Sequence, residues 1–109
     1  MKTRQDIYNE TPIETYNGKE YKVRRSYHRR TNQLKMESYY GLSNKNLLGA
    51  LIVNEFYPSG VLKRYAELYK NGNLKHVIDY SENGSIIADL LFESNGQPIK
   101  KNPTMIEIN

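Results

Sequence analysis

The stretch YAELYKNGNLKHVIDYSENGSIIADLLFESNG, residues 65–96, decides the fold, because glycine recurs in it at a fixed interval. With one more glycine upstream, four glycines stand 12 residues apart: Gly60, Gly72, Gly84 and Gly96. Turn-forming residues precede each of them, and glycine tolerates the left-handed backbone that closes a three-residue hairpin loop. We therefore expect loops at residues 58–60, 70–72, 82–84 and 94–96. Strands joined by loops this short run antiparallel, so the sequence predicts a meander.

Loops of three residues pair positions of equal parity, which predicts one apolar and one polar face for the sheet. The apolar face would consist of the even-numbered positions Ile52, Phe56, Leu62, Ala66, Leu68, Leu74, Ile78, Tyr80, Ile86, Ala88, Leu90 and Phe92. In this register Lys63 lies opposite Asp79 and Glu67 opposite Lys75, and such pairs add modest stability. A two-residue turn at 71–72 is the alternative, which pairs Glu67 with His76 and Arg64 with Asp79 but mixes the two faces.

The first half of the chain continues this pattern less regularly. YNGK and RRTN predict turns, and the segments around them alternate apolar with polar residues. A four-residue loop at 29–32 would place Arg24 opposite Glu37. The segment LLGALIV (47–53) is apolar on both faces and predicts a covered strand, with a short helix as the alternative.

These patterns define an all-β fold, an antiparallel up-and-down meander of about seven or eight strands, as a curled single sheet or an open barrel. The 109 residues are a single domain by length, with regular 12-residue hairpin repeats over residues 56–96. Residues 1–10 show no strand pattern and are allowed to be flexible, and residues 100–109 can add an edge strand. A second copy could cover the apolar sheet face, which makes a homodimer one expectation.

Composition and the first residues indicate in which cellular compartment the protein is expected. The chain has no cysteine and no apolar run long enough to span a membrane, and its first residues lack the apolar stretch of a signal peptide. These features predict a cytoplasmic protein without a membrane partner. The net charge of +4 is uneven, because residues 1–50 contain ten Lys and Arg against five Asp and Glu, whereas residues 51–109 contain six against seven.

The hairpin units share a pattern of an aromatic residue, turn-forming residues, glycine and a following apolar residue. FYPSGVLK (56–63), LYKNGNLK (68–75) and DYSENGSI (79–86) follow it, and YHRRTNQLK (27–35) is a degenerate copy with Asn32 in the glycine position. Residues 56–96 thus resemble the variant MORN repeats of bacteria, although the chain lacks the tryptophan of the usual tandem unit. The resemblance implies a binding scaffold of the antitoxin or immunity type, with no shared catalytic residues.

No residue pattern points to catalysis or to a cofactor. The two histidines, His28 and His76, have no partners at metal-ligand spacing, and we expect neither to bind a metal. The serines lie mostly in or beside turns without a neighbouring base, and no helix follows the glycines as a phosphate loop requires. We expect a protein that is not an enzyme and that uses neither metal nor cofactor.

Two sets of residues are candidates for contacting a partner. The first is a basic patch within the segment 19–35, with interleaved aromatic residues: Lys22, Arg24, Arg25, Arg29, Arg30 and Lys35. Such a patch suits single-stranded nucleic acid and also an acidic protein surface. The second is a row of tyrosines and lysines on the predicted polar face: Tyr39, Tyr57, Tyr65, Tyr69, Lys63 and Lys75. Tyrosine is frequent among interface anchors.

The sequence therefore suggests a non-enzymatic binding protein that neutralises or occludes a partner protein, such as a toxin or a host enzyme. An antitoxin, an immunity protein or an inhibitor is the concrete form of this interpretation, and it depends on the resemblance to MORN repeats. The alternative is a small nucleic-acid-binding protein that uses the basic segment 19–35.

Overall fold

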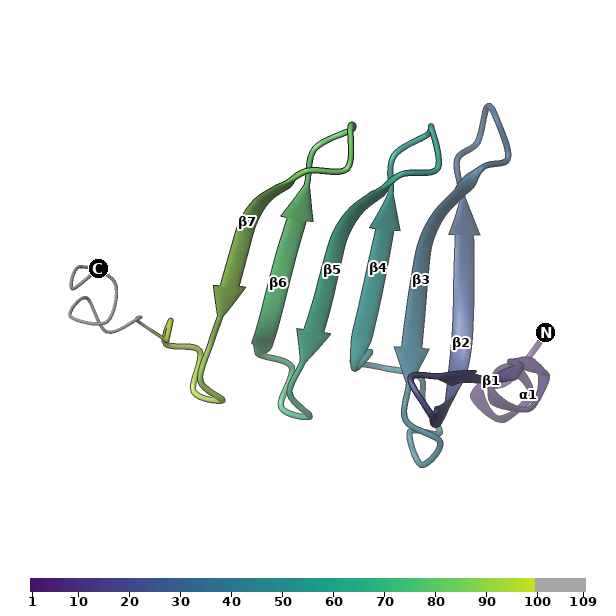
Figure 1. Ribbon diagram of the computed structural model, residues 1–109. Coiled ribbons are helices and arrows are strands. Elements are labelled where there is room, and N and C mark those ends of the chain that lie inside the picture. Colours follow the sequence, from purple (N-terminus) through teal and green to yellow (C-terminus); the bar gives the residue numbers. More distant parts are fainter. Residues whose placement is uncertain (100–109) are drawn as a thin grey trace, which may run out of the picture.

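The computed structural model describes residues 1–99 and shows seven antiparallel strands in one sheet, with one short helix beside its N-terminal end (Figure 1). The elements are α1 (Arg4–Glu10), β1 (Ile13–Tyr16), β2 (Lys19–Tyr27), β3 (Leu34–Tyr40), β4 (Ile52–Phe56), β5 (Leu62–Leu68), β6 (Leu74–Tyr80) and β7 (Ile86–Leu91). Neighbouring strands follow chain order, so β1 and β7 are the edges of an open sheet within the described residues. The predicted all-β meander is confirmed, as a single sheet that does not close on itself. The predicted tail strand at 100–109 lies outside the described residues, and α1, with seven residues, is too short to cross a membrane.

The hairpin turns end at the glycines, as the sequence predicts. In the β5–β6 turn, Gly72 N–H donates to Tyr69 O at 2.9 Å and Tyr69 N–H donates to Asn73 O at 2.8 Å. These bonds close a three-residue loop in which Gly72 has φ +92°, a region that favours glycine. The corresponding residue of the β2–β3 turn is Asn32, also at positive φ (+60°), which agrees with its place in the glycine position.

A β-bulge follows each of these turns and shifts the register by one residue. In the β4–β5 hairpin, Phe56 pairs with Leu62 but the next pair is Glu55 with Arg64, which leaves Lys63 as an extra residue. The β2–β3, β5–β6 and β6–β7 hairpins show the same shift. The extra residue is always the third after the glycine position: Lys35, Lys63, Lys75 and Ile87.

The predicted loop length is confirmed, but the predicted pairing of residues across the strands is wrong because of the bulges. Arg64 lies opposite Asp79 and Glu67 opposite His76, the pairs expected for a two-residue turn. The turn nevertheless has three residues, and the bulge supplies the shift of one. For the same reason Arg24 is not opposite Glu37, because the bulge places Arg25 there instead.

The predicted single apolar face is wrong as well, because each bulge reverses the parity of the strand that follows. We call face A the side that carries Tyr39, Ile52 and Tyr65, and face B the side that carries Val53 and Ala66, since directly paired residues share a face. The apolar residues beside the β4–β5 and β6–β7 turns lie on face A: Phe56, Leu62, Tyr80 and Ile86. Those beside the β5–β6 turn lie on face B: Leu68 and Leu74. Each face is therefore apolar at one end of the strands.

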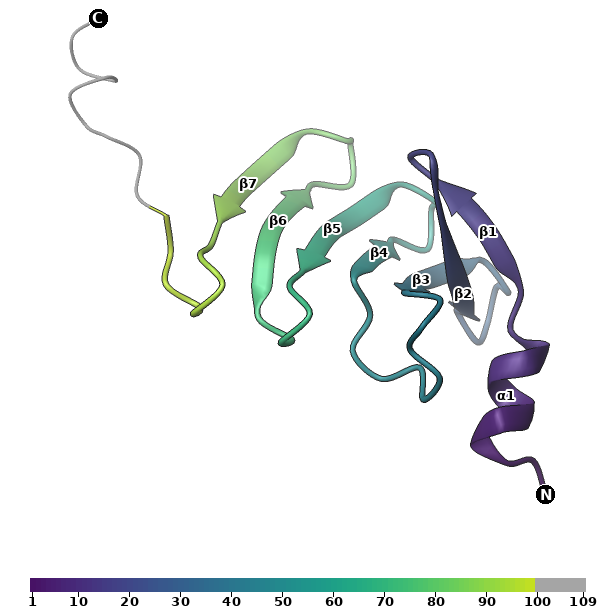
Figure 2. The same cartoon turned by 90° about the horizontal axis from the view of Figure 1, so that it is seen from below.

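The buried core lies on face A at the N-terminal end of the sheet. It consists of Tyr21, Val23, Tyr39 and Ile52, with Tyr16, Leu51 and Tyr65 packed against it. The chain before β2 covers this region, since β1 runs across the end of β2 and places the Tyr16 ring 4.6 Å from that of Tyr39 (Figure 2). The opposite end of the sheet, at β7, projects as a single layer in the same view.

Two segments outside the regular hairpins have structure that the sequence analysis did not predict. Residues 1–10 contain the helix α1, whose first turn is closed by a capping box between Thr3 and Asp6. The segment 47–53 is neither a helix nor a strand along its whole length. Its strand begins at Ile52, and Leu47 is a buried loop residue at φ +53°.

Candidate protein-binding surfaces

Lys22, the first residue of the predicted basic patch, is an internal anchor. Only 6% of its surface is exposed, and its ammonium donates to Tyr8 O at 2.9 Å and to Thr11 O at 2.8 Å. It also lies 4.2 Å from the centre of the Tyr8 ring. Lys22 therefore fastens the end of α1 to β2, and its charge is not free to meet a partner.

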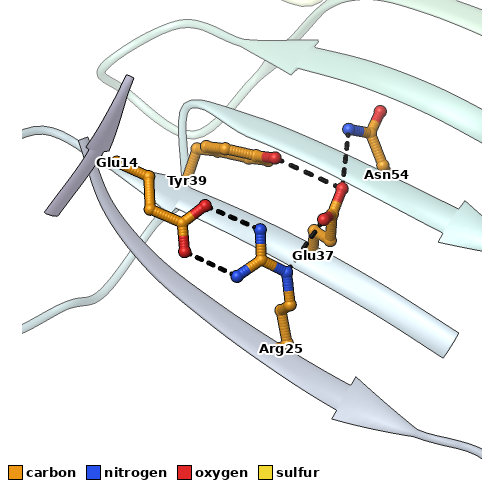
Figure 3. Close-up of polar contacts among 5 residues, drawn as sticks. All are labelled: Glu14, Arg25, Glu37, Tyr39 and Asn54. Carbon is orange, nitrogen blue, oxygen red and sulfur yellow. Dashed lines mark hydrogen bonds and ion pairs between the residues drawn. The ribbon is translucent and has the colours of Figure 1, made fainter. Parts of the chain in front are cut away.

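Arg25 is also committed to contacts within the chain (Figure 3). Its guanidinium donates two hydrogen bonds to Glu14, at 2.6 and 2.7 Å, and a third to Glu37 at 2.9 Å. Glu37 in turn accepts from the Tyr39 hydroxyl and from the Asn54 side-chain amide. Hydrogen bonding to Arg25 lowers the pKa of Glu14, and hydrogen bonding to Glu14 raises the pKa of Arg25. This network joins β1, β2, β3 and β4 on face A.

The other four members of the predicted basic patch are exposed: Arg24, Arg29, Arg30 and Lys35. Arg24 lies on face B, because it pairs with Ser38, which pairs with Val53. Arg29 and Arg30 occupy the turn after β2, and Lys35 is the extra residue of the first bulge. The patch that sequence reasoning placed on one strand-turn is thus reduced by two charges and divided between β2, its turn and β3.

Two tyrosines of the predicted row, Tyr39 and Tyr65, belong to face A and not to a polar binding face. Tyr39 is 4% exposed within the core, and Tyr65 is half-buried against it. Burial, with a further contribution from Glu37, raises the pKa of Tyr39 to about 12, and burial also raises the pKa of Tyr65. Their rings stabilise the core, so the prediction that they line one polar face with Tyr57 is wrong.

The remaining members of the row, Tyr57 and Tyr69, connect successive hairpins. Tyr57 donates its hydroxyl to Tyr80 O at 2.7 Å, and Tyr69 donates to Phe92 O at 2.8 Å. The extra residues of the bulges, Lys63 and Lys75, lie over these two rings, each ammonium 5.7 Å from the ring centre: Lys63 over Tyr57 and Lys75 over Tyr69. The repeated Tyr and Lys positions therefore stabilise the turns, and the lysines remain exposed at their tips.

The most exposed apolar surface lies on β7, and sequence reasoning did not identify it. The exposed fractions are 58% for Ile86, 65% for Ile87, 50% for Leu90 and 47% for Leu91. Leu90 pairs with Val77 and Leu91 with His76, so these side chains emerge on both faces of the strand. The doubled apolar residues of SIIADLLF were the available signal, because a strand with one covered face alternates apolar with polar residues.

The histidines act as hydrogen-bonding groups in the sheet. His76 Nε2 is 2.7 Å from Asp89 Oδ1 on the neighbouring strand, and His28 Nε2 is 3.2 Å from Phe56 O. Among residues 1–99 no group of three or more His, Cys, Asp or Glu side chains is arranged to hold a metal ion.

Comparison of the chain with protein-family models, with curated proteins and with solved structures found no match. The fold itself defines a single-layer antiparallel β protein, and its function must be inferred from the surfaces that the sheet leaves open.

Proposed function

We propose that this protein is a non-enzymatic binding protein that occludes a partner protein, in the manner of an antitoxin, an immunity protein or an inhibitor. The observation that carries the proposal is the exposed apolar surface of β7, formed by Ile86, Ile87, Leu90 and Leu91. We call these four residues the β7 surface. These side chains emerge on both faces of the strand, and large exposed apolar surfaces are uncommon on monomeric proteins and mark sites of interaction.

The energetics of the sheet support this proposal. The N-terminal end has a core on face A, whereas β7 pairs with one strand, β6, and its outer edge meets only the short turn-back in which Ile99 N–H donates to Leu91 O. Full burial of one large aliphatic side chain contributes about 1.5–3 kcal/mol, and these residues are about half exposed, so a partner that covered the β7 surface would gain about half of this value from each. The resemblance of the hairpin units to variant MORN repeats favours the same kind of function.

Two features favour a protein partner over nucleic acid. The charged groups of Lys22 and Arg25 are bound by backbone carbonyls at the end of α1 and by Glu14 and Glu37, which leaves fewer cations for phosphate groups. Apolar side chains such as those of the β7 surface are suited to a protein interface, where aliphatic and aromatic groups pack together.

The test is capture of a partner by the tagged protein from its native cells, compared between the wild type and the double variant Ile87→Glu, Leu90→Glu. We expect a stoichiometric protein that the wild type retains and the double variant loses, and whose activity or toxicity falls when the wild type is added. Ser43→Glu is the matched control, since it adds negative charge in the exposed loop between β3 and β4, away from β7.

Two results would contradict the proposal. Capture that is unaffected by the double variant, with circular dichroism showing intact strands, would remove the β7 surface from the interface. A wild-type dimer that becomes monomeric in the double variant by light scattering would show that a second copy covers this surface, as in the homodimer that the sequence suggested.

A further inference from the structure

The outer edge of β2 is free over part of its length. β1 pairs with β2 only as far as Lys22, and the next outward amide, that of Val23, donates to Pro12 O at 3.0 Å. In an antiparallel ladder the backbone groups of alternate residues point to opposite sides of the strand. Because His28 N–H donates inward to the β3 side, at Gln33 O, the N–H and C=O groups of Arg25 and Tyr27 point outward, where no described strand meets them.

A groove accompanies this free edge. It has a volume of about 510 Å³ and lies between α1 and β2, with Ile7 and Glu10 on the helix side and Val23, Arg24, Arg25 and Tyr27 on the strand side. Arg24 and Arg25, which belong to opposite faces of the sheet, both line it, so the groove runs along the edge and not over one face. An added strand would lie along this open groove and bond to the edge.

The charge of the groove favours an acidic occupant. Its lining includes Lys2, which is paired with Glu10, and Arg25, which is paired with Glu14 and Glu37, together with Arg24. Arg24 makes no ion pair among the described residues. The exposed Arg29 and Arg30 follow where β2 ends, and they extend the positive charge beyond the groove.

We propose that the free edge of β2 binds an extended, acidic segment of a partner protein as an additional strand. The proposal deepens the proposed function, on which it rests, by giving the chemistry of one partner segment. The available edge, residues 24–27, is about 14 Å long at the usual rise of a strand, enough for a segment of about four residues. Backbone groups of Arg25 and Tyr27 bind the segment, and Arg24 with the arginines of the turn selects its acidic side chains.

Two other occupants fit less well. A second copy of β2 at this edge would bring Arg24, Arg29 and Arg30 of both chains together, and like charges oppose such pairing. A nucleic-acid backbone offers phosphate acceptors but no row of alternating donors and acceptors, so it would leave the outward carbonyls of Arg25 and Tyr27 without partners.

The experiment uses a short fluorescein-labelled peptide of alternating glutamate and valine, titrated with the full chain and followed by fluorescence anisotropy. We expect saturable binding that weakens with salt, and that is lost when alternate peptide amides are N-methylated, because the edge contacts are backbone hydrogen bonds. Arg24→Glu should weaken binding about tenfold or more, whereas Lys70→Glu, the same charge change far from the groove, should have little effect.

Amide hydrogen exchange by NMR gives a readout that does not depend on any variant. On adding the peptide, the Arg25 and Tyr27 amides should become protected, while those of Arg24 and Ser26, which face β3, are protected beforehand. Equal binding of the N-methylated peptide, or unchanged exchange at Arg25 and Tyr27, would overturn the proposal.

A labelled oligothymidine that bound more tightly and displaced the peptide would assign the edge to nucleic acid instead. Failure at this edge leaves the capture experiment on the β7 surface unaffected, so the two proposals fail separately.

Discussion

Replacing Arg25 with methionine tests how much the Glu14–Arg25–Glu37 network stabilises the sheet. Methionine keeps most of the aliphatic stem but removes the three hydrogen bonds of the guanidinium. The pair with Glu37 is the more protected, since the glutamate side chain is 14% exposed, whereas that of Glu14 is 36% exposed. A hydrogen bond to a charged group contributes about 1.5–3 kcal/mol and an exposed ion pair about 0.2–1 kcal/mol, so we expect a total loss of about 2–3 kcal/mol.

The assay is equilibrium unfolding in urea, followed by circular dichroism, with the thermal midpoint as a second measure. For a domain of this size, the expected loss lowers the thermal midpoint by roughly 10–20 °C. The matched control is Arg64→Met, which also removes a two-bond contact to one carboxylate, that of Asp79. Arg64 is 46% exposed, so its loss should cost only about 0.5–1 kcal/mol.

Equal destabilisation by the two variants would refute the reasoning, because it would mean that the burial of Glu37 adds nothing to the contact. A loss for Arg25→Met below that of Arg64→Met would have the same meaning.

Three further predictions concern the titration of carboxylates and the hairpins. Hydrogen bonds to arginine lower the pKa of Glu14 and Asp79 in the folded protein. The stability that these two carboxylates confer is therefore present above about pH 4.5 and is lost as the pH falls through the lowered pKa values. Urea midpoints should fall over this range, and they should fall less steeply for Arg25→Met. Gly72→Ala should cost about 1–2 kcal/mol because φ is +92°, whereas Gly41→Ala, at an ordinary φ, should cost less; equal urea midpoints would contradict the assigned turn. Tyr69→Phe removes the hydroxyl that reaches the next hairpin and should cost about 1 kcal/mol, and an unchanged urea midpoint would show that this bond does not stabilise the sheet.

The turns could be predicted from the sequence because their requirement is local. A loop that needs a left-handed residue selects glycine, or asparagine as at Asn32, wherever the turn occurs. The alternation of antiparallel strands follows from the short loops, which explains why the meander and its strand order were accessible from residues 56–96 alone.

The strand pairing could not be predicted from the sequence, because the sequence supports the register with the bulge and the register without it nearly equally well. Either register pairs opposite charges, for instance Lys63 or Arg64 with Asp79. The bulge position holds lysine three times and isoleucine once, so no residue type reveals it by itself. The shared spacing from the glycine position becomes informative only when the hairpins are compared.

The candidate surfaces were predicted less well for the same reason. The tyrosine row was inferred from parity, and the parity reverses at each bulge, so Tyr39 lies in the core while Tyr57 joins two turns. The basic patch was correctly placed near β2, but only side-chain geometry shows that Lys22 and Arg25 have internal partners. The capping box of Thr3 and Asp6 was a readable signal for α1 that a strand-centred interpretation passed over.

The bulge in each hairpin also limits how such a protein can change in length. One unit of 12 residues reverses the chain direction and moves the apolar residues beside the turn to the other face. Two units restore both, and the bonds Tyr57 to Tyr80 and Tyr69 to Phe92 accordingly join residues 23 positions apart, nearly two units. Insertions or deletions of 24 residues would thus preserve every later contact, whereas a change of 12 residues would move all later turns to the opposite end of the sheet. The smallest insertion or deletion that keeps this fold is therefore one pair of strands.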